Sequence, residues 1–89
     1  MAKIAFILLC NKNSRSIIEQ ARRLAAAGDY VSIHFDAGGR RADFRAIREA
    51  LADNPNICFA RKRLKCGWGA WSLVQASLNA LQSAVETFA

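Results

Sequence analysis

Apolar residues in this chain gather into short continuous runs, and the segments that separate the runs carry apolar residues at helical spacing. The run from Ile4 to Cys10 is apolar throughout, which is typical of a strand covered on both faces. Tyr30 to Asp36 and Ile57 to Ala60 predict two further strands. The pattern therefore alternates strand and helix along the whole chain.

The first intervening segment predicts a helix that begins at Asn13 or Ser14, with Ser16 and Glu19 as an alternative capping box. Gly28 is expected to end this helix as the residue after its C-cap. The buried stripe of the helix is expected to consist of apolar side chains about one turn apart: Ile17, Ala21, Leu24 and Ala25.

Asp43 is the expected cap of a second helix, which ends before Pro55 because proline disfavours helix in the preceding residue. Its apolar side carries Phe44, Ile47 and Leu51, and its other side carries Arg45, Arg48 and Glu49. A third helix is predicted to open with a capping box at Ser72 and Gln75. Its large apolar residues recur at helical spacing on one face: Val74, Leu78, Leu81, Val85 and Phe88.

The order β-α-β-α-β-α predicts an α/β fold in three layers, with a parallel sheet and helices on its faces. At 89 residues the chain is one domain at most, covering residues 1–89. Ligands of such sheets bind beyond the carboxyl ends of the strands. We therefore expect the residues that follow the strands to converge on one rim: Cys10 to Lys12, Asp36, and Arg61 to Trp68.

A tryptophan framed by glycines lies in the last of these segments. Gly67 and Gly69 permit backbone conformations closed to other residues and a close approach by a ligand. Trp68 beside Lys65 suits a flat ring that carries phosphate, and the alternative is that Trp68 packs over the edge of the core. Asp36 has two interpretations as well, since a carboxylate there can accept from a nucleoside or can close a turn.

The net charge of +6 favours anionic partners such as nucleotide phosphates, nucleic acid or an acidic membrane surface. Basic residues are usually only solvated surface charge. Here they concentrate in two clusters: Arg40, Arg41, Arg45 and Arg48, then Arg61, Lys62, Arg63 and Lys65. No apolar run approaches the about 20 residues of a membrane span. We expect a cytoplasmic protein, at most peripheral to a membrane.

Several familiar sites are missing from the sequence. It has no glycine-rich dinucleotide fingerprint, no phosphate-binding loop signature and no Asp-x-Asp pair for a metal-bound pyrophosphate. The odd number of cysteines, 3, argues against a disulfide framework, and Cys10 and Cys58 are expected to be small core residues. His34 is expected to pack or to form hydrogen bonds inside the sheet.

Three segments nevertheless match one family in order and spacing. They are the run from Ile4 to Lys12, the run from Val31 to Asp36 with its I-H-x-D pattern, and Trp68 to Ala76 with its W-G-x-x-S-L-V-Q-A pattern. Over nearly its whole length the chain resembles the amino-terminal part of the core-2/I-branching β-1,6-N-acetylglucosaminyltransferase family (glycosyltransferase family 14), and its bacterial members most.

The resemblance implies the first, nucleotide-binding half of a GT-A fold, which binds the uridine of a UDP-sugar without a metal ion or other cofactor. Carried over by position, Asp36 would contact uracil or ribose, and Leu9 and Cys10 would line the base pocket. Trp68 would lie near the nucleotide, and Ser72 would organise the helix start. Independently of the resemblance, the basic residues Lys12, Arg63 and Lys65 are candidates for contacts with phosphate at the rim. Asn11 departs from the family, in which histidine is common at that position.

The family's catalytic glutamate and its main diphosphate-binding residues lie further along the polypeptide than this sequence reaches. We therefore expect the chain to be the UDP-sugar-binding portion of a longer inverting glycosyltransferase that acts on a glycan acceptor, inactive alone, or else a truncated piece or a remnant domain. One alternative is a small basic module that binds nucleic acid, which we rank well below the first. Another is an assembly module that forms homo-oligomers through the exposed, apolar edge of its first strand.

Overall fold

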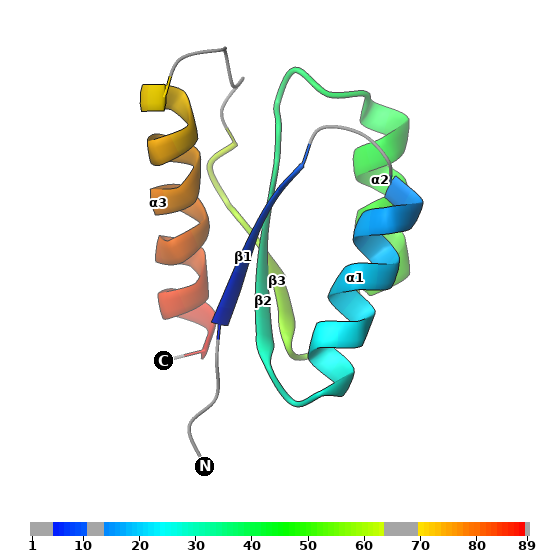
Figure 1. Cartoon of the computed structure of the whole chain (residues 1–89). Helices are drawn as coiled ribbons and strands as arrows, with labels where there is room; N and C mark the ends of the chain where they lie inside the picture. The colour runs from blue at the N-terminus through cyan, green and yellow to red at the C-terminus, as the bar shows by residue number, and fades with distance from the viewer. Residues whose placement is uncertain (1–4, 11–13, 64–69, 89) are drawn as a thin grey trace.

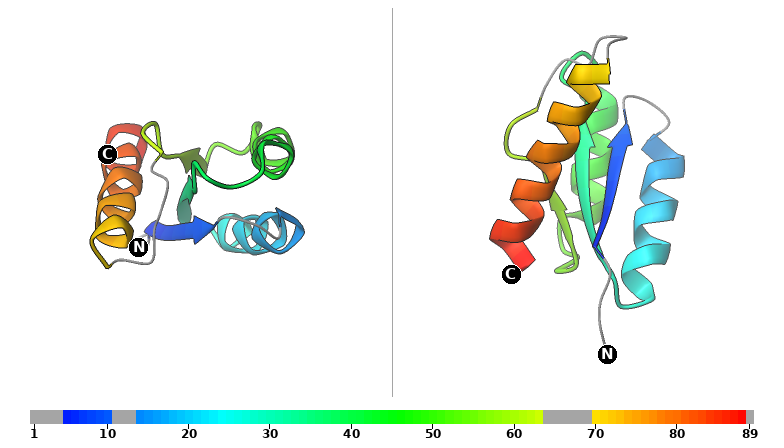
Figure 2. Two further views of the ribbon diagram at one scale, coloured as in Figure 1. Left: turned by 90° about the horizontal axis from the view of Figure 1, so that it is seen from above. Right: turned by 60° about the vertical axis from the view of Figure 1, so that its left-hand side comes forward.

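The structure is a computed structural model, and it describes residues 5–10, 14–63 and 70–88, with only the backbone of residues 70–73. Three parallel strands form one sheet in the order β1-β2-β3, with β1 at Ala5–Cys10, β2 at Tyr30–Phe35 and β3 at Ile57–Phe59. Helices α1 (Ser14–Ala26) and α2 (Arg41–Leu51) cover one face of the sheet, and α3 (Ala70–Phe88) covers the other (Figures 1 and 2). The predicted three-layer α/β fold with its β-α-β-α-β-α order is confirmed.

The central strand β2 has one apolar face and one polar face. Val31, Ile33 and Phe35 are fully or almost fully buried against the α1 and α2 layer. That layer contributes the expected stripes, including Ala21 and Ala25 of α1 and, from α2, Ile47 and Leu51. Ser32 and His34 alternate with the apolar residues and are equally buried on the side of α3.

Helix α3 packs on this polar face through its small residues. Its buried positions are Ala76, Asn79, Ala80, Ser83 and Ala84. The large apolar residues that dominate the sequence pattern lie on the opposite side of α3 and stay about half exposed: Val74 (48%), Leu78 (49%), Leu81 (45%) and Val85 (56%). Four of the five residues of the apolar stripe therefore do not take part in the packing of α3 on the sheet.

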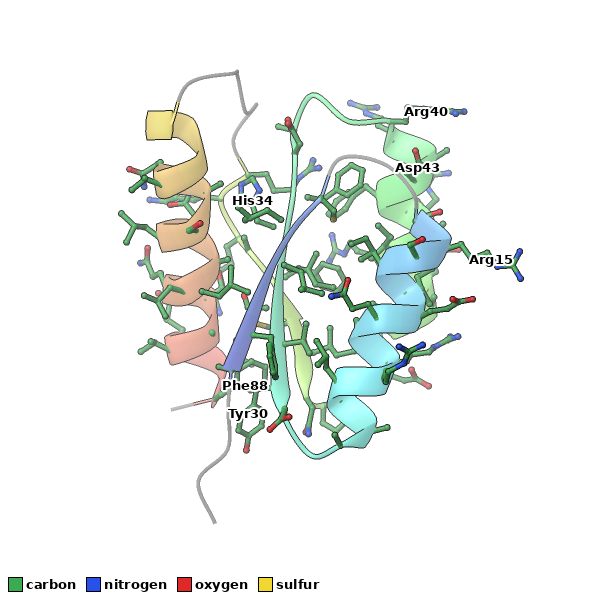
Figure 3. The ribbon with its side chains drawn as sticks, viewed as in Figure 1. Arg15, Tyr30, His34, Arg40, Asp43 and Phe88 are labelled. Atoms are coloured by element: carbon green, nitrogen blue, oxygen red, sulfur yellow. The ribbon has the colours of Figure 1, made fainter. Side chains whose placement is uncertain are left out.

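The reason lies in the partner surface. The Ser32 hydroxyl donates a hydrogen bond of 2.7 Å to the carbonyl oxygen of Ala80, and only small side chains let a helix backbone come that close to a sheet. Phe88, the fifth member of the predicted stripe, stacks instead on Tyr30 with ring centroids 4.5 Å apart (Figure 3).

The end of α1 follows its sequence signal. Gly28 has φ +92°, its amide donates to Ala25, and the amide of Asp29 donates to Leu24, which together form a Schellman motif. The predicted helix starts are less accurate. Helix α2 begins at Arg41, and its N-cap Arg40 makes no side-chain capping bond. Asp43 is therefore not the cap but lies in the first turn, where its negative charge interacts favourably with the helix dipole.

Two predicted capping boxes are also misplaced. Ser16 lies inside α1, and Ser72 lies inside α3, which already includes Ala70. Neither serine is therefore an N-cap. In the part of the chain that the structure describes, β1 pairs with β2 alone, and Leu9 is 39% exposed, in agreement with the expected apolar edge.

Candidate functional site

The carboxyl ends of β1 and β2 meet side by side at one edge of the sheet. The amide of Asp36 donates a hydrogen bond of 2.8 Å to the carbonyl oxygen of Cys10, and Leu9 lies opposite His34 in the strand register. The next strand continues the edge, since the amide of Ala60 donates to Ile33 at 2.8 Å. We call this edge, with the residues that follow each strand and the start of α2, the rim.

Asp36 closes a turn at the rim. Its Oδ1 atom accepts a hydrogen bond of 2.7 Å from the amide of Gly38, and its carbonyl oxygen accepts one of 2.9 Å from Gly39. The residue is only 9% exposed. The turn role that the sequence left open is therefore present, and the turn fixes the position of the carboxylate. Contact with a nucleoside stays a prediction for this residue.

Leu9 and Cys10 point to opposite faces of the sheet because successive side chains of a strand alternate. Cys10 packs against the core beside α1 and α2, and its thiol donates a weak hydrogen bond of 3.9 Å to the carbonyl oxygen of His34. Burial raises the pKa of the Cys10 thiol to about 11. A ligand at this edge would therefore contact the exposed side chain of Leu9. It would contact Cys10 mainly through the backbone of that residue, because the Cys10 side chain is turned toward the core.

Arg63 follows β3 and is held over an aromatic ring. Its guanidinium carbon lies 4.0 Å from the centroid of the Phe44 ring, and Arg48 approaches the same ring at 5.6 Å. Phe44 in turn stacks on Phe35 with centroids 5.4 Å apart. A cation held over an aromatic face keeps its charge while its stem is packed. Arg63 is thus held beside the start of α2, where Arg40 also lies (Figure 3).

His34 is buried between the sheet and α3, as the sequence suggested (Figure 3). Burial lowers the pKa of the imidazole, and the nearby charge of Arg63 lowers it further, while a backbone hydrogen bond and Asp36 act in the opposite direction. The ring is therefore neutral at pH 7. His34 lies in β2 two residues before Asp36, so the buried ring supports the part of the strand that leads into the rim.

The polar residues on the inner side of α3 hold the basic segment after β3, and sequence reasoning missed them. Asn79 donates a hydrogen bond of 3.1 Å to the carbonyl oxygen of Lys62, and the amide of Arg61 donates to Ser83 Oγ at 3.1 Å. Arg61 also forms an ion pair of 3.3 Å with Glu86. The signal that could have revealed this contact is the presence of Asn79 and Ser83 among alanines at helical spacing.

An open hollow of about 170 Å³ lies between this segment and α3, lined by Arg61, Lys62, Asn79, Gln82, Ser83 and Glu86. Small-molecule sites usually measure about 300–1,000 Å³. The hollow is therefore smaller than a nucleotide site, and neither Asp36 nor Cys10 lines it. We do not assign the nucleotide to it.

Three of the predicted site residues, Lys12, Lys65 and Trp68, lie outside the described residues. The described residues bring together Leu9, Cys10 and Asp36 and add Arg63 at the same edge. Within the described ranges, no group of three or more histidine, cysteine or acidic side chains could hold a metal ion. No described helix is both long enough and apolar enough to cross a membrane.

Comparison with known proteins adds no identification to this geometry. No protein-family model matches the chain, and no curated protein matches its sequence.

Proposed function

We propose that the rim binds the uridine diphosphate part of a nucleotide sugar. The chain would then be the donor-binding portion of an inverting, metal-independent glycosyltransferase that transfers N-acetylglucosamine or a related sugar to a glycan hydroxyl. The observation that carries the proposal is the hydrogen bond of 2.8 Å between Asp36 and Cys10, which joins the two strand ends that the family resemblance assigns to the nucleoside. Parallel α/β sheets bind ligands beyond such ends.

The proposal gives each rim residue a chemical task. Leu9 offers an apolar surface to the uracil ring, and the carboxylate of Asp36 accepts from ribose hydroxyls or from the base. Arg63, and in the same way Lys12 and Lys65, supply positive charge for the diphosphate. Trp68 would stack on a ring of the donor.

The reaction itself would need a general base from outside this sequence, as the family resemblance implies. That base would deprotonate an acceptor hydroxyl, whose oxygen then attacks the anomeric carbon while the bond to UDP breaks on the opposite side. Inversion follows from this single displacement. We therefore expect donor binding, and no transfer, from the chain alone.

Titration with UDP, followed by backbone amide shifts, tests the proposal. We expect saturable shifts at Leu9, Asp36, Gly38 and Gly39, and small shifts at Asp53, at the far end of α2. Asp36→Asn is the sharpest variant, because asparagine keeps an acceptor oxygen for the Gly38 amide and removes only the charge. It should weaken UDP binding by about 10-fold or more, as expected for a charged hydrogen-bond partner.

Matched controls remove equal charges near the amino-terminal ends of the strands, away from the rim. Asp53→Asn and Arg23→Gln change exposed residues there and should leave UDP binding unchanged, whereas Arg63→Gln should weaken it. A folded sample whose rim amides do not respond to millimolar UDP would contradict the proposal. Tight binding to a single-stranded oligonucleotide, lost steeply with salt and indifferent to uridine, would favour the nucleic-acid alternative.

A further inference from the structure

The outer side of α3 carries an unpartnered apolar stripe formed by Val74, Leu78, Leu81 and Val85. These residues are 45% to 56% exposed, although they are the largest aliphatic side chains described on the helix. Among the described elements, α3 stands alone in its layer (Figure 2). Contiguous exposed apolar residues of this kind mark interaction surfaces more often than isolated ones do.

The spacing of the stripe is that of a helix–helix seam. Its members follow one another at intervals of four, three and four residues, which is the a/d pattern of a helix that packs lengthwise on another helix. A helix of 19 residues is about 28 Å long, and the stripe from Val74 to Val85 extends over about 17 Å of it. The occupant that this pattern predicts is therefore another helix.

The order of residues in the stripe is symmetric about its centre. Reading Val74, Leu78, Leu81, Val85 backwards gives the same residue types at the same intervals. In an antiparallel pair with a two-fold axis between residues 79 and 80, Leu78 would face Leu81 of the second copy, and Val74 would face its Val85. A two-fold interface requires this self-complementarity, because each residue must fit its counterpart in both directions.

The flanks of the stripe carry no charge that would oppose such a pair. Gln75, Ser77, Gln82 and Ala84 border the stripe, and Glu86 is the one charged residue in α3. Glu86 is already paired with Arg61. The same composition argues against a lipid surface, since membrane-surface helices carry lysine and arginine beside their apolar face.

We propose that α3 forms a two-fold, antiparallel helix pair with a second copy of this chain through Val74, Leu78, Leu81 and Val85. Four half-exposed side chains per copy make a narrow contact compared with the about 800 Å² per partner of a standard interface. The pair is therefore a weak dimer whose population depends on the concentration of the chain. This surface lies on the side of α3 that faces away from the sheet, and it does not require the proposed nucleotide site.

Sedimentation equilibrium of the full chain, without nucleotide, tests the proposal over about 1 µM to 1 mM, which corresponds to association free energies of about 4 to 8 kcal/mol. The average mass should rise from one chain to two. The double variant Leu78→Glu/Leu81→Glu places like charges together in any helix pairing and should lower the association constant by at least about 100-fold. Ala46→Glu adds the same type of charge to an exposed position of α2 and should leave it unchanged.

A second double variant tests the direction of the pair. Leu78→Lys/Leu81→Glu places lysine opposite glutamate in the antiparallel arrangement and like charges opposite each other in a parallel one. It should associate at least about 10-fold more tightly than the double glutamate variant. All these positions are exposed, so circular dichroism should show an unchanged fold.

A single-chain mass at every concentration would overturn the proposal and would indicate that the stripe seats a different polypeptide. An undiminished dimer in the double glutamate variant would overturn it as well. Equal loss of association in both double variants would overturn the antiparallel arrangement. Because no nucleotide is present, none of these outcomes bears on UDP binding.

Discussion

The hydroxyl of Ser32 donates a buried hydrogen bond of 2.7 Å to the carbonyl oxygen of Ala80, and this contact joins the central strand to α3. A serine under a helix is unusual in a core, where a buried polar atom needs a partner. Here the partner is a helix carbonyl, and the contact is possible because Ala80 has no side chain beyond Cβ. Both residues are inaccessible to solvent.

Ser32→Ala should lower the free energy of unfolding by about 1 kcal/mol, because it removes this hydrogen bond without adding volume. Urea denaturation measures the change. Ser16→Ala, on the exposed side of α1, is the control and should stay within about 0.5 kcal/mol of the parent. Equal effects of the two substitutions would show that the Ser32 bond does not stabilise the fold.

Ala76→Leu should destabilise the protein by about 1–3 kcal/mol, because Ala76 is fully buried where α3 approaches the sheet and the added atoms have no room. Ala46→Leu makes the same change at an exposed position of α2 and should have little effect. Thermal unfolding distinguishes the two. Should Ala76→Leu be tolerated, α3 would not sit as close to the sheet as its small residues indicate.

Stability should fall as the pH drops below about 6.5, the ordinary pKa of histidine. The pKa of His34 is lowered in the folded protein, chiefly by burial. The unfolded chain therefore binds a proton at a higher pH than the folded chain, and the stability present above pH 6.5 is lost as the pH falls toward the folded pKa. The loss approaches about 1.4 kcal/mol per pH unit for one proton.

His34→Gln should remove this part of the pH dependence, since glutamine does not titrate. Denaturation curves between pH 5 and 8 provide the measurement, and the range stays above the ordinary carboxylate pKa values of about 4. A variant that retained the same slope would assign the effect to other groups.

The Cys10 thiol should react slowly with alkylating reagents in the folded protein at pH 8. Burial raises its pKa from 9.0 to about 11, and the reactive species is the thiolate. Ionisation alone then slows alkylation by about 100-fold relative to the denatured chain. Peptide mapping after timed labelling measures the rate, and equally fast labelling in both states would place Cys10 outside the core.

The strands and the buried sides of α1 and α2 could be predicted because their sequence signals agree with their surroundings. The stripe of Ile47 and Leu51 faces an apolar layer, and so does the side of β1 that carries Leu8 and Cys10. Gly28 was equally clear, since its φ of +92° is a conformation that residues with a side chain rarely adopt. At these positions local preference and tertiary packing favour the same structure. The expectation that β1 is covered on both faces is wrong, since Leu9 on its other side is exposed.

The orientation of α3 could not be predicted from its own sequence. The helix has two candidate faces, one with large apolar residues and one with alanines, Asn79 and Ser83. Which face turns inward depends on the polar side of β2, more than 30 residues earlier in the chain, where the Ser32 hydroxyl donates to the carbonyl oxygen of Ala80. Hydrophobic periodicity weighs side-chain size and does not include this contact.

Part of the candidate site could be predicted, because strand order and direction alone bring some of its residues together. Parallel topology alone places Cys10 and Asp36 at a common edge, and the sequence shows that topology. The stacking of Arg63 on Phe44 and the anchoring of Lys62 by Asn79 join residues far apart in sequence, and no local pattern marks such pairs.

Helix α3 holds the backbone of Arg61 and Lys62 through Ser83 and Asn79 on one side and presents its aliphatic stripe on the other. The helix therefore connects two surfaces, and a shift of α3 would also move the backbone of Arg61 and Lys62, which is hydrogen-bonded to it. A partner on the outer surface that favoured a different position of α3 would therefore also change the inner surface, and by linkage the coupling would be equal in both directions.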